Sequence, residues 1–322
     1  MDDLTNTILD KVLTKKLELE GHDSDAILPS VKKKYAVCLY GQLRAIDTIV
    51  DNFNKNLIEK LDADLYVHVQ RTNTNIDNNI HLLNTENKVI YDPSDVTQTF
   101  INYHNLLKRN NYIDIACLRL YENLYKIYEL WGDEFEQKYE YIILTRSDYL
   151  HLFSFPDIVN LCDDKDLFWF YDGHEWGGIN VTLSVVPYKY IKFFLKSFYN
   201  YLQDLNNVSL LNSMDLNAER FVKLIFETNN WKIGKISPNA FITASSYNEI
   251  TTWGQVQYCE TYKVFYKYSC PKNYAYDSLN KYNSNEKWTF KKNINTRFSY
   301  YCDCGACMYK HTSNAYSIVL MP

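Results

Sequence analysis

The stretch "YIILTRSDYL" (residues 141–150) decides how this chain folds. Its first four residues are apolar, and Arg146 and Asp148 follow almost at once. A uniformly apolar run is typical of a parallel strand that helices cover on both faces. In open parallel sheets, ligands bind outside the carboxyl ends of the strands. The sequence therefore predicts a buried strand that ends in an arginine and a carboxylate where a ligand would sit.

Strands and helices alternate on both sides of this run. An apolar strand over 35–40 breaks at Gly41, and apolar residues then recur at helical spacing from Ile46 to Leu61. The remaining elements that the pattern predicts are strands within 62–72, 88–92, 166–171, 179–187 and 231–246, and helices over 95–107, 113–131, 188–205 and 214–229. The helix over 113–131 is expected to stop near Gly132.

This alternation indicates an α/β fold, Rossmann-like, with a mostly parallel central sheet flanked by helices. We expect three parts: an N-terminal leader helix in residues 1–30, a main domain in residues 31–245, and a C-terminal extension in residues 246–322. The extension is rich in cysteine and aromatic residues and shows no clear periodicity.

Composition excludes several classes of function. Lys plus Arg number 34 and Asp plus Glu number 39, a net charge of 34 − 39 = −5, without the basic stripe that binding to a nucleic acid backbone needs. No run of about 18 apolar residues exists, so we expect no membrane span. The first 25 residues carry frequent charges and no signal-peptide core, which favours a cytoplasmic protein.

Three motifs in this order resemble a known family. They are Gly-Gln-x-Arg at 41–44, a long helix leading into "YEYIILTRSDYL" (139–150), and "GGIN" (177–180). Together they resemble nucleotide-sugar glycosyltransferases with the GT-A fold, over about residues 35–240. The chain looks most similar to the loosely characterised branch encoded by large DNA viruses, algae and bacteria, where Arg-x-Asp replaces Asp-x-Asp. If the source is viral, the expected location is the host cytoplasm.

The resemblance implies a metal-dependent glycosyltransferase. Such an enzyme moves a sugar from a nucleoside-diphosphate donor to a hydroxyl of a glycan or protein acceptor. It implies Mn²⁺ or Mg²⁺ at Asp148, bridging the diphosphate oxygens, with Arg146 pairing with the carboxylate or binding a phosphate. The alternative is that Arg146 and Asp148 simply form an ion pair that caps a strand.

The resemblance also assigns a nucleotide-binding role to Gly41, Gln42 and Arg44. Glycine allows close approach to the backbone, and the other two offer donors to base, ribose or phosphate. A turn glycine followed by a solvated arginine is the alternative. Gln70 and Arg71 end the next strand and could reach the same place if the sheet is parallel.

Asp172 and Glu175 are the candidates for the catalytic base. An inverting transferase needs a group that takes the proton from the acceptor hydroxyl. In the resembling family an acidic residue often follows the Asn of the "GGIN" segment, whereas here Val181 follows Asn180. The alternative is a polar turn between strands. Glu219, early in a predicted helix, is a candidate for a supporting role.

The tail contains Cys302, Cys304, Cys307 and His311 in "YCDCGACMYKH". Thiolates and an imidazole this close in sequence suit a tetrahedral structural zinc site. Reduced thiols in a packed tail and disulfides are the alternatives.

Two other functions compete with glycosyl transfer. One is a catalytically silent, transferase-like binding module that acts through its C-terminal tail. The other is a class I methyltransferase or a dinucleotide enzyme, because many doubly wound folds share a strand followed by a glycine. Only Gly41 stands in the first turn, so the glycine-rich fingerprint of dinucleotide sites is missing.

Overall fold

The structure is a computed structural model of the 322-residue chain. It describes residues 32–71, 79–92, 115–171, 177–204, 206–207, 211, 217–236, 240–244, 256–259, 263–266, 287–295, 298–299, 310–311 and 314–321.

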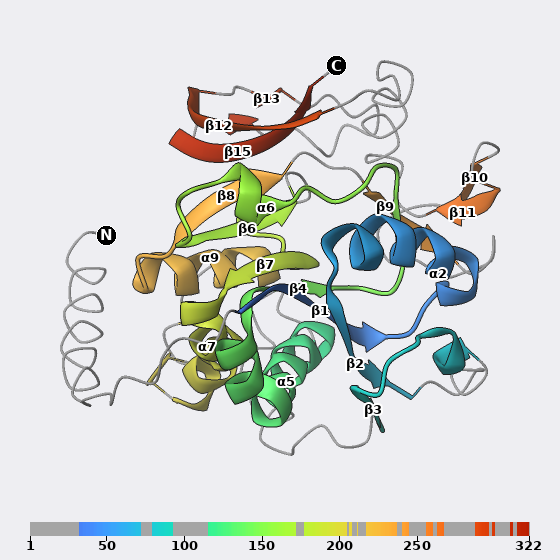
Figure 1. Cartoon of the computed structure of the whole chain (residues 1–322). Helices are drawn as coiled ribbons and strands as arrows, with labels where there is room; N and C mark the ends of the chain where they lie inside the picture. The colour runs from blue at the N-terminus through green and yellow to red at the C-terminus, as the bar shows by residue number, and fades with distance from the viewer. Residues whose placement is uncertain are drawn as a thin grey trace.

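Helices and strands alternate along the first two thirds of the chain (Figure 1). The strands are β1 (Lys33–Gln42), β2 (Asp64–Gln70), β3 (Lys88–Tyr91), β4 (Tyr139–Thr145), β5 (Tyr149–His151), β6 (Leu167–Tyr171), β7 (Leu183–Pro187), β8 (Lys232–Ile236), β9 (Ala240–Ala244), β10 (Gln257–Cys259), β11 (Val264–Tyr266), β12 (Lys287–Asn295), β13 (Phe298–Ser299), β14 (Lys310–His311) and β15 (Asn314–Met321). The helices are α2 (Ile46–Phe53), α5 (Ile115–Lys138), α6 (Ile158–Leu161), α7 (Ile191–Gln203) and α9 (Ala218–Thr228), with a π-helical turn η1 (Asn54–Glu59) and the 3-10 turns η2 (Ile80–Leu82) and η4 (Tyr188–Tyr190).

The central sheet has nine strands in the order β12-β15-β8-β6-β7-β4-β1-β2-β3. From β3 to β4 all neighbours are parallel, and β7 is antiparallel to both β4 and β6. Strands β6, β8 and β15 therefore run in the same direction as β4. The expectation of a mostly parallel, Rossmann-like α/β sheet flanked by helices is confirmed.

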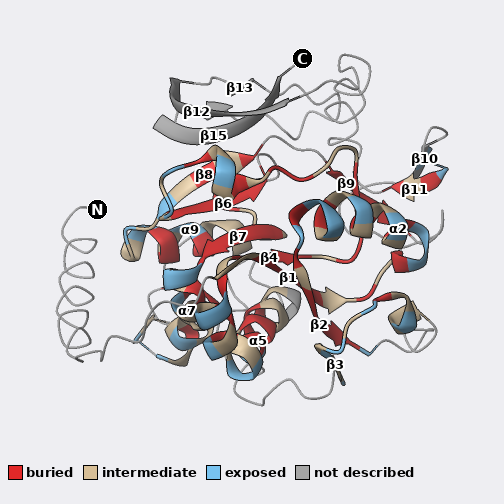
Figure 2. Ribbon diagram, in the orientation of Figure 1, coloured by how far each residue is buried: buried red, intermediate tan, exposed pale blue. Residues whose placement is uncertain are grey.

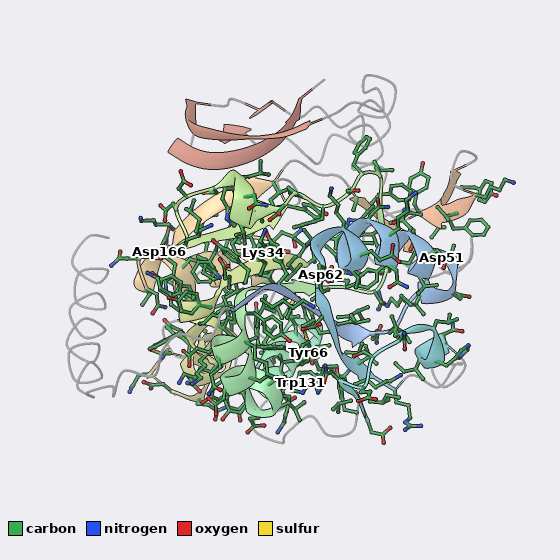
Figure 3. The ribbon with its side chains drawn as sticks, viewed as in Figure 1. Lys34, Asp51, Asp62, Tyr66, Trp131 and Asp166 are labelled. Atoms are coloured by element: carbon green, nitrogen blue, oxygen red, sulfur yellow. The ribbon has the colours of Figure 1, made fainter. Side chains whose placement is uncertain are left out.

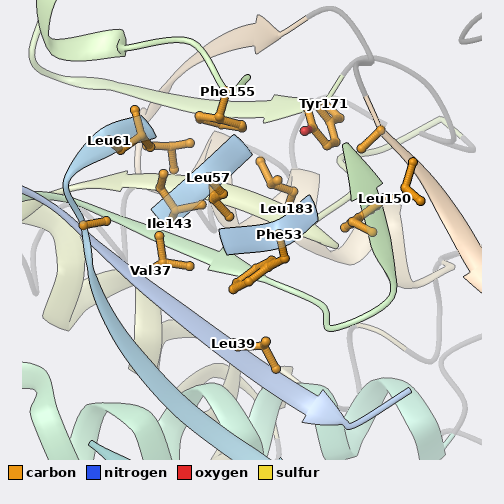
Figure 4. Close-up of a cluster of buried hydrophobic side chains, with 14 of the residues drawn as sticks. Val37, Leu39, Phe53, Leu57, Leu61, Ile143, Leu150, Phe155, Tyr171 and Leu183 are labelled. Atoms are coloured by element: carbon orange, nitrogen blue, oxygen red, sulfur yellow. The ribbon is translucent and has the colours of Figure 1, made fainter. Parts of the chain in front are cut away.

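Apolar residues fill both faces of the middle of this sheet, which explains why β1, β4, β6 and β7 are largely apolar (Figure 2). Alternate residues of a strand point to opposite faces. One set packs with α2 and η1 through Val37, Leu39, Phe53 and Leu57 (Figure 4). The other set packs with α5, α7 and α9 and includes Cys38.

Helix α5 is longer than the sequence indicates. It continues through Gly132 to Lys138, so the predicted stop near Gly132 is wrong. A Cβ on Gly132 would lie 2.8 Å from the ring of Tyr128, so this glycine accommodates a side chain of its own helix. The added turn carries Phe135 onto Tyr66 of β2, beside Trp131 (Figure 3).

A second sheet, of four strands in the order β10-β11-β9-β5, begins where β4 ends. Only Arg146, Ser147 and Asp148 separate β4 from β5. The stretch around Asp148 is therefore the junction between the two sheets.

Two strands of the C-terminal extension belong to the central sheet. Strand β15 pairs in parallel with β8, and β12 pairs antiparallel with β15. The predicted leader helix and the predicted helix over 95–107 lie outside the described residues. No helix in the described part of the chain is long and apolar enough to cross a bilayer.

Candidate active site

Two of the predicted motifs meet at the carboxyl edge of the central sheet. Strands β1 and β4 are parallel neighbours, with Leu39 opposite Thr145. The end of β1 with the residues after it, Gly41 to Arg44, and the residues after β4, Arg146 to Asp148, therefore lie side by side at this edge. This is the edge at which open α/β sheets bind ligands.

Gly41 has a backbone conformation that favours glycine, with φ at +90°. A Cβ at this position would meet nothing within 4 Å, so the requirement comes from the backbone angle and not from crowding. Ala45, just before α2, is also left-handed, with φ at +48°. The strand thus turns sharply between Gly41 and the first turn of α2.

Arg146 and Asp148 form a two-pronged ion pair. Arg146 Nε donates to Asp148 Oδ1 at 2.7 Å, and Nη2 donates to Oδ2 at 2.7 Å. The Asp148 side chain is 1% exposed, whereas that of Arg146 is 25% exposed. The chain turns at Ser147 and Asp148, and this turn brings the two side chains together.

The Ser147 hydroxyl joins the two motifs. It accepts a hydrogen bond from the Arg44 backbone N–H at 2.7 Å. It also lies within donating distance of the carbonyl oxygens of Gln42, at 3.0 Å, and Arg44, at 3.1 Å. Ser147 is fully buried, so this hydroxyl is the internal link between the turn after β1 and the turn after β4.

Arg44 is oriented by a neutral group. Its Nε donates to the Gln42 Oε1 at 2.9 Å, and its Nη2 donates to the same oxygen. Both residues are only partly buried. Arg44, Arg146 and Asp148 together carry a net charge of 2 − 1 = +1, because one carboxylate accompanies two guanidinium groups.

Side chains from neighbouring strands support this cluster. Thr243 of β9 donates to the Asp148 carbonyl oxygen from its backbone N–H at 2.7 Å and from its hydroxyl at 3.0 Å. Tyr40 donates to the Val181 carbonyl at 3.1 Å. Burial raises the pKa of Tyr40, and the nearby positive charge of Arg146 partly opposes that rise.

The "GGIN" motif packs directly against the start of α9. A Cβ on Gly178 would lie 1.9 Å from the Glu219 carbonyl carbon, and the Ile179 N–H donates to the Glu219 carbonyl at 2.9 Å. Asn217 caps α9 by accepting from the Arg220 N–H at 2.8 Å. Glu219 thus contacts the "GGIN" segment through its backbone carbonyl group.

Strand β2 contributes to the same edge. Gln70 lies opposite Gln42 in the register of β1 and β2, and it is 8% exposed. Arg71 pairs instead with Asp92, its Nε lying 3.4 Å from Oδ1. Two residues before Gln70 in β2, the Nδ1 atom of His68 contacts Asn123 Oδ1. Burial lowers the pKa of His68.

The described residues do not fit the expected Mn²⁺ or Mg²⁺ site. Both carboxylate oxygens of Asp148 accept hydrogen bonds from Arg146, so a cation there would compete with a guanidinium and lie beside its positive charge. No group of three or more His, Cys, Asp or Glu side chains within the described ranges could hold a metal ion.

Several predicted site residues lie outside the described residues. Asp172 and Glu175 follow β6, which ends at Tyr171 on the same edge of the sheet as β1 and β4. The three zinc candidates Cys302, Cys304 and Cys307 lie outside as well, and of His311 only the backbone, in β14, is described. The catalytic base and the structural zinc stay predictions.

The sequence analysis missed three residues that hold the site together: Ser147, Tyr40 and Thr243. Ser147 carried a usable signal, because a small hydroxyl between two charged residues at a strand end suits a buried link between loops. Tyr40 and Thr243 gave none, since their hydrogen-bond partners lie 141 and 95 residues away in sequence.

Comparisons with known proteins find similarity in structure only. No family profile matches the sequence, and no curated protein matches it. Matching solved structures include a glycosyltransferase involved in glycosylation of the major capsid of PBCV-1 (12% identity, 53% of this chain, 68% of that chain, TM-score 0.30). Others are mouse xyloside xylosyltransferase 1 (8%, 62% and 84%, 0.40) and the mannosyltransferase Ktr4p of S. cerevisiae (10%, 71% and 78%, 0.37).

Proposed function

We propose that this protein is a glycosyltransferase that moves a sugar from a nucleoside-diphosphate donor to a hydroxyl of a glycan or protein. One observation carries the proposal. The two motifs that resemble nucleotide-sugar enzymes are joined by the Ser147 hydroxyl at the carboxyl edge of a mostly parallel sheet, through contacts that span 103 and 105 residues of sequence. That edge carries two guanidinium groups, which suit a diphosphate.

The proposed reaction breaks the bond between the anomeric carbon and the diphosphate oxygen. The electron pair of that bond stays on the diphosphate, and Arg44 and Arg146 stabilise the added negative charge. The acceptor oxygen forms the new bond to the anomeric carbon. Its proton passes to Asp172 or Glu175, the proposed bases in an inverting reaction.

A thermal-shift panel tests donor binding. The full chain is heated with UDP-, GDP- and ADP-linked sugars, in EDTA and separately with Mn²⁺. A ligand that binds the native state at a hundredfold excess over its Kd stabilises it by about 2.7 kcal/mol, so one donor class should raise the Tm. Inorganic phosphate at equal ionic strength is the control.

Turnover of the donor that binds separates an enzyme from a binding module. We expect slow release of the nucleoside diphosphate by hydrolysis, because water can replace the acceptor. Binding without release, even with an acceptor panel, would favour the catalytically silent module. No shift with any sugar nucleotide, with or without Mn²⁺, would contradict the proposed function.

A further inference from the structure

The Arg146–Asp148 pair carries an inference about how the leaving group is neutralised, and it rests on the proposed function. We propose that the Arg146 guanidinium, oriented by the buried Asp148 carboxylate, binds the donor diphosphate in place of a divalent cation. Arg146 is then the diphosphate-binding residue, and Asp148 is its positioning residue. The reaction needs no added metal.

The burial of the two side chains separates their roles. Asp148 is 1% exposed, so a ligand has almost no access to it, whereas a quarter of the Arg146 side chain remains exposed. A buried carboxylate is costly unless a charged partner satisfies it, and here two N–H groups of one guanidinium do so at 2.7 Å. The acid therefore holds the arginine, and the arginine is the group that a ligand can reach.

The two hydrogen bonds to Asp148 also prepare the remaining N–H groups of Arg146 for the oxygens of a phosphate. Two parallel hydrogen bonds define the plane of the guanidinium and restrict the rotation of a long side chain. Less rotational freedom is then lost when a phosphate binds. A fixed donor that needs no rearrangement is the arrangement that best stabilises charge developing in a transition state.

The described charges of Arg44, Arg146 and Asp148 favour an anion over a second cation. Arg44 is oriented by the neutral amide of Gln42, so Arg44, Arg146 and Asp148 sum to +1. A divalent cation would enter this positive field and would have to displace Arg146 from both oxygens of Asp148. A diphosphate entering the same field is attracted.

The test compares nucleotide affinity and turnover of the full-length wild type in EDTA and in Mn²⁺. The probes are UDP, GDP and inorganic pyrophosphate, measured by calorimetry. We expect the Kd of the preferred nucleotide and the kcat for its sugar to be the same in both conditions. The Arg146→Gln/Asp148→Asn double variant removes both charges together, so that no buried carboxylate is left alone, and should bind about 10- to 100-fold more weakly.

Two further variants separate the roles. Arg146→Lys keeps the charge and loses the fork, so it should recover only part of the affinity. Asp148→Asn should raise the KM for the donor, and added Mn²⁺ should not reverse the loss, because the acid acts through Arg146. If Asp148 bound a metal ion, the defect of the Asp148→Asn variant would instead become smaller as the Mn²⁺ concentration rises.

A second ion pair, away from the candidate site, serves as control for the double variant. Lys33 of β1 and Asp64 of β2 pair, Nζ to Oδ1 at 2.8 Å, at the opposite end of these two strands. Lys33→Gln/Asp64→Asn should leave nucleotide affinity unchanged.

Each outcome decides the inference. Nucleotide binding that needs no metal and is lost when Arg146 is substituted supports the inference. Binding or turnover that requires Mn²⁺ overturns it and leaves the proposed function standing. Pyrophosphate binding in EDTA that depends on Arg146, without binding of any nucleotide, supports the anion site and contradicts the proposed donor. Failure of the wild type to bind any of the three probes overturns the inference, and the thermal-shift panel of sugar nucleotides then decides the proposed function.

Discussion

At the scale of single residues, the site depends on side chains that a ligand would not touch. Ser147 is fully buried, and its one hydroxyl serves the backbones of both Gln42 and Arg44. Asp148 is likewise hidden and acts on Arg146. The groups able to meet a ligand, Arg44 and Arg146, are thus positioned by neighbours that are buried or neutral.

Ser147→Ala should destabilise the protein and disorganise the site. The variant leaves the Arg44 N–H without its hydroxyl acceptor in a buried turn, which costs about 1 to 3 kcal/mol. Urea unfolding measures the loss. Ser197→Ala is the control: its hydroxyl bonds to Phe193 within α7 at an exposed position, and the change should stay within about 0.5 kcal/mol. Equal stabilities of the two variants would contradict the linking role.

At the scale of elements, glycines allow the strands and helices around the site to approach. Gly178 lies against the backbone of Glu219, so that the "GGIN" segment rests on the first turn of α9. Gly41 is needed for a different reason, its positive φ, and has open space around it. Glycine therefore serves packing in one motif and backbone conformation in the other.

Substitution by alanine should distinguish these two glycines. Gly178→Ala places a Cβ within 1.9 Å of Glu219 backbone atoms, which cannot rotate away, and should cost about 3 kcal/mol or more. Gly41→Ala only strains the backbone and should cost about 1 to 3 kcal/mol. Denaturant unfolding of both variants provides the comparison. A milder loss for Gly178→Ala than for Gly41→Ala would show that "GGIN" does not pack this closely.

At the scale of the whole molecule, the candidate site and the far edge of the sheet are separate. Strand β15 stands four strands from β4 in the sheet order, about 19 Å at normal strand spacing. It lies between β8 and β12, so it covers the edge of β8 and leaves β12 as the outermost strand. Its contribution should be to stability and not to ligand binding.

Ser317→Pro tests this separation. Ser317 pairs with Lys235 of β8 and Lys291 of β12, and proline removes its N–H from the sheet. We expect a Tm clearly below that of the wild type, together with an unchanged Kd for the nucleotide that the wild type binds. Weakened nucleotide binding by the folded variant would mean that the far edge does shape the site.

Much of the fold was predictable because local patterns are enough to identify its elements. The continuous apolar runs of β1, β4 and β6 identify covered strands, and the helical spacing after Gly41 and before Lys138 identifies α2 and α5. The end of α5 was not predictable from Gly132. The Tyr128 ring occupies the space that a Cβ on residue 132 would need, and this contact explains a glycine inside the helix.

The sequence by itself determined which residues end the central strands, and hence that arginines and a carboxylate gather at one edge of the sheet. Only the tertiary structure decided what those groups do to one another. A turn at Ser147 and Asp148 directs the acid onto Arg146, and Thr243 of a second sheet holds the acid's carbonyl in place. The physical reason is that periodicity is a local property of the chain, whereas the burial of Asp148 and the hold on its carbonyl depend on residues distant in sequence, such as Thr243.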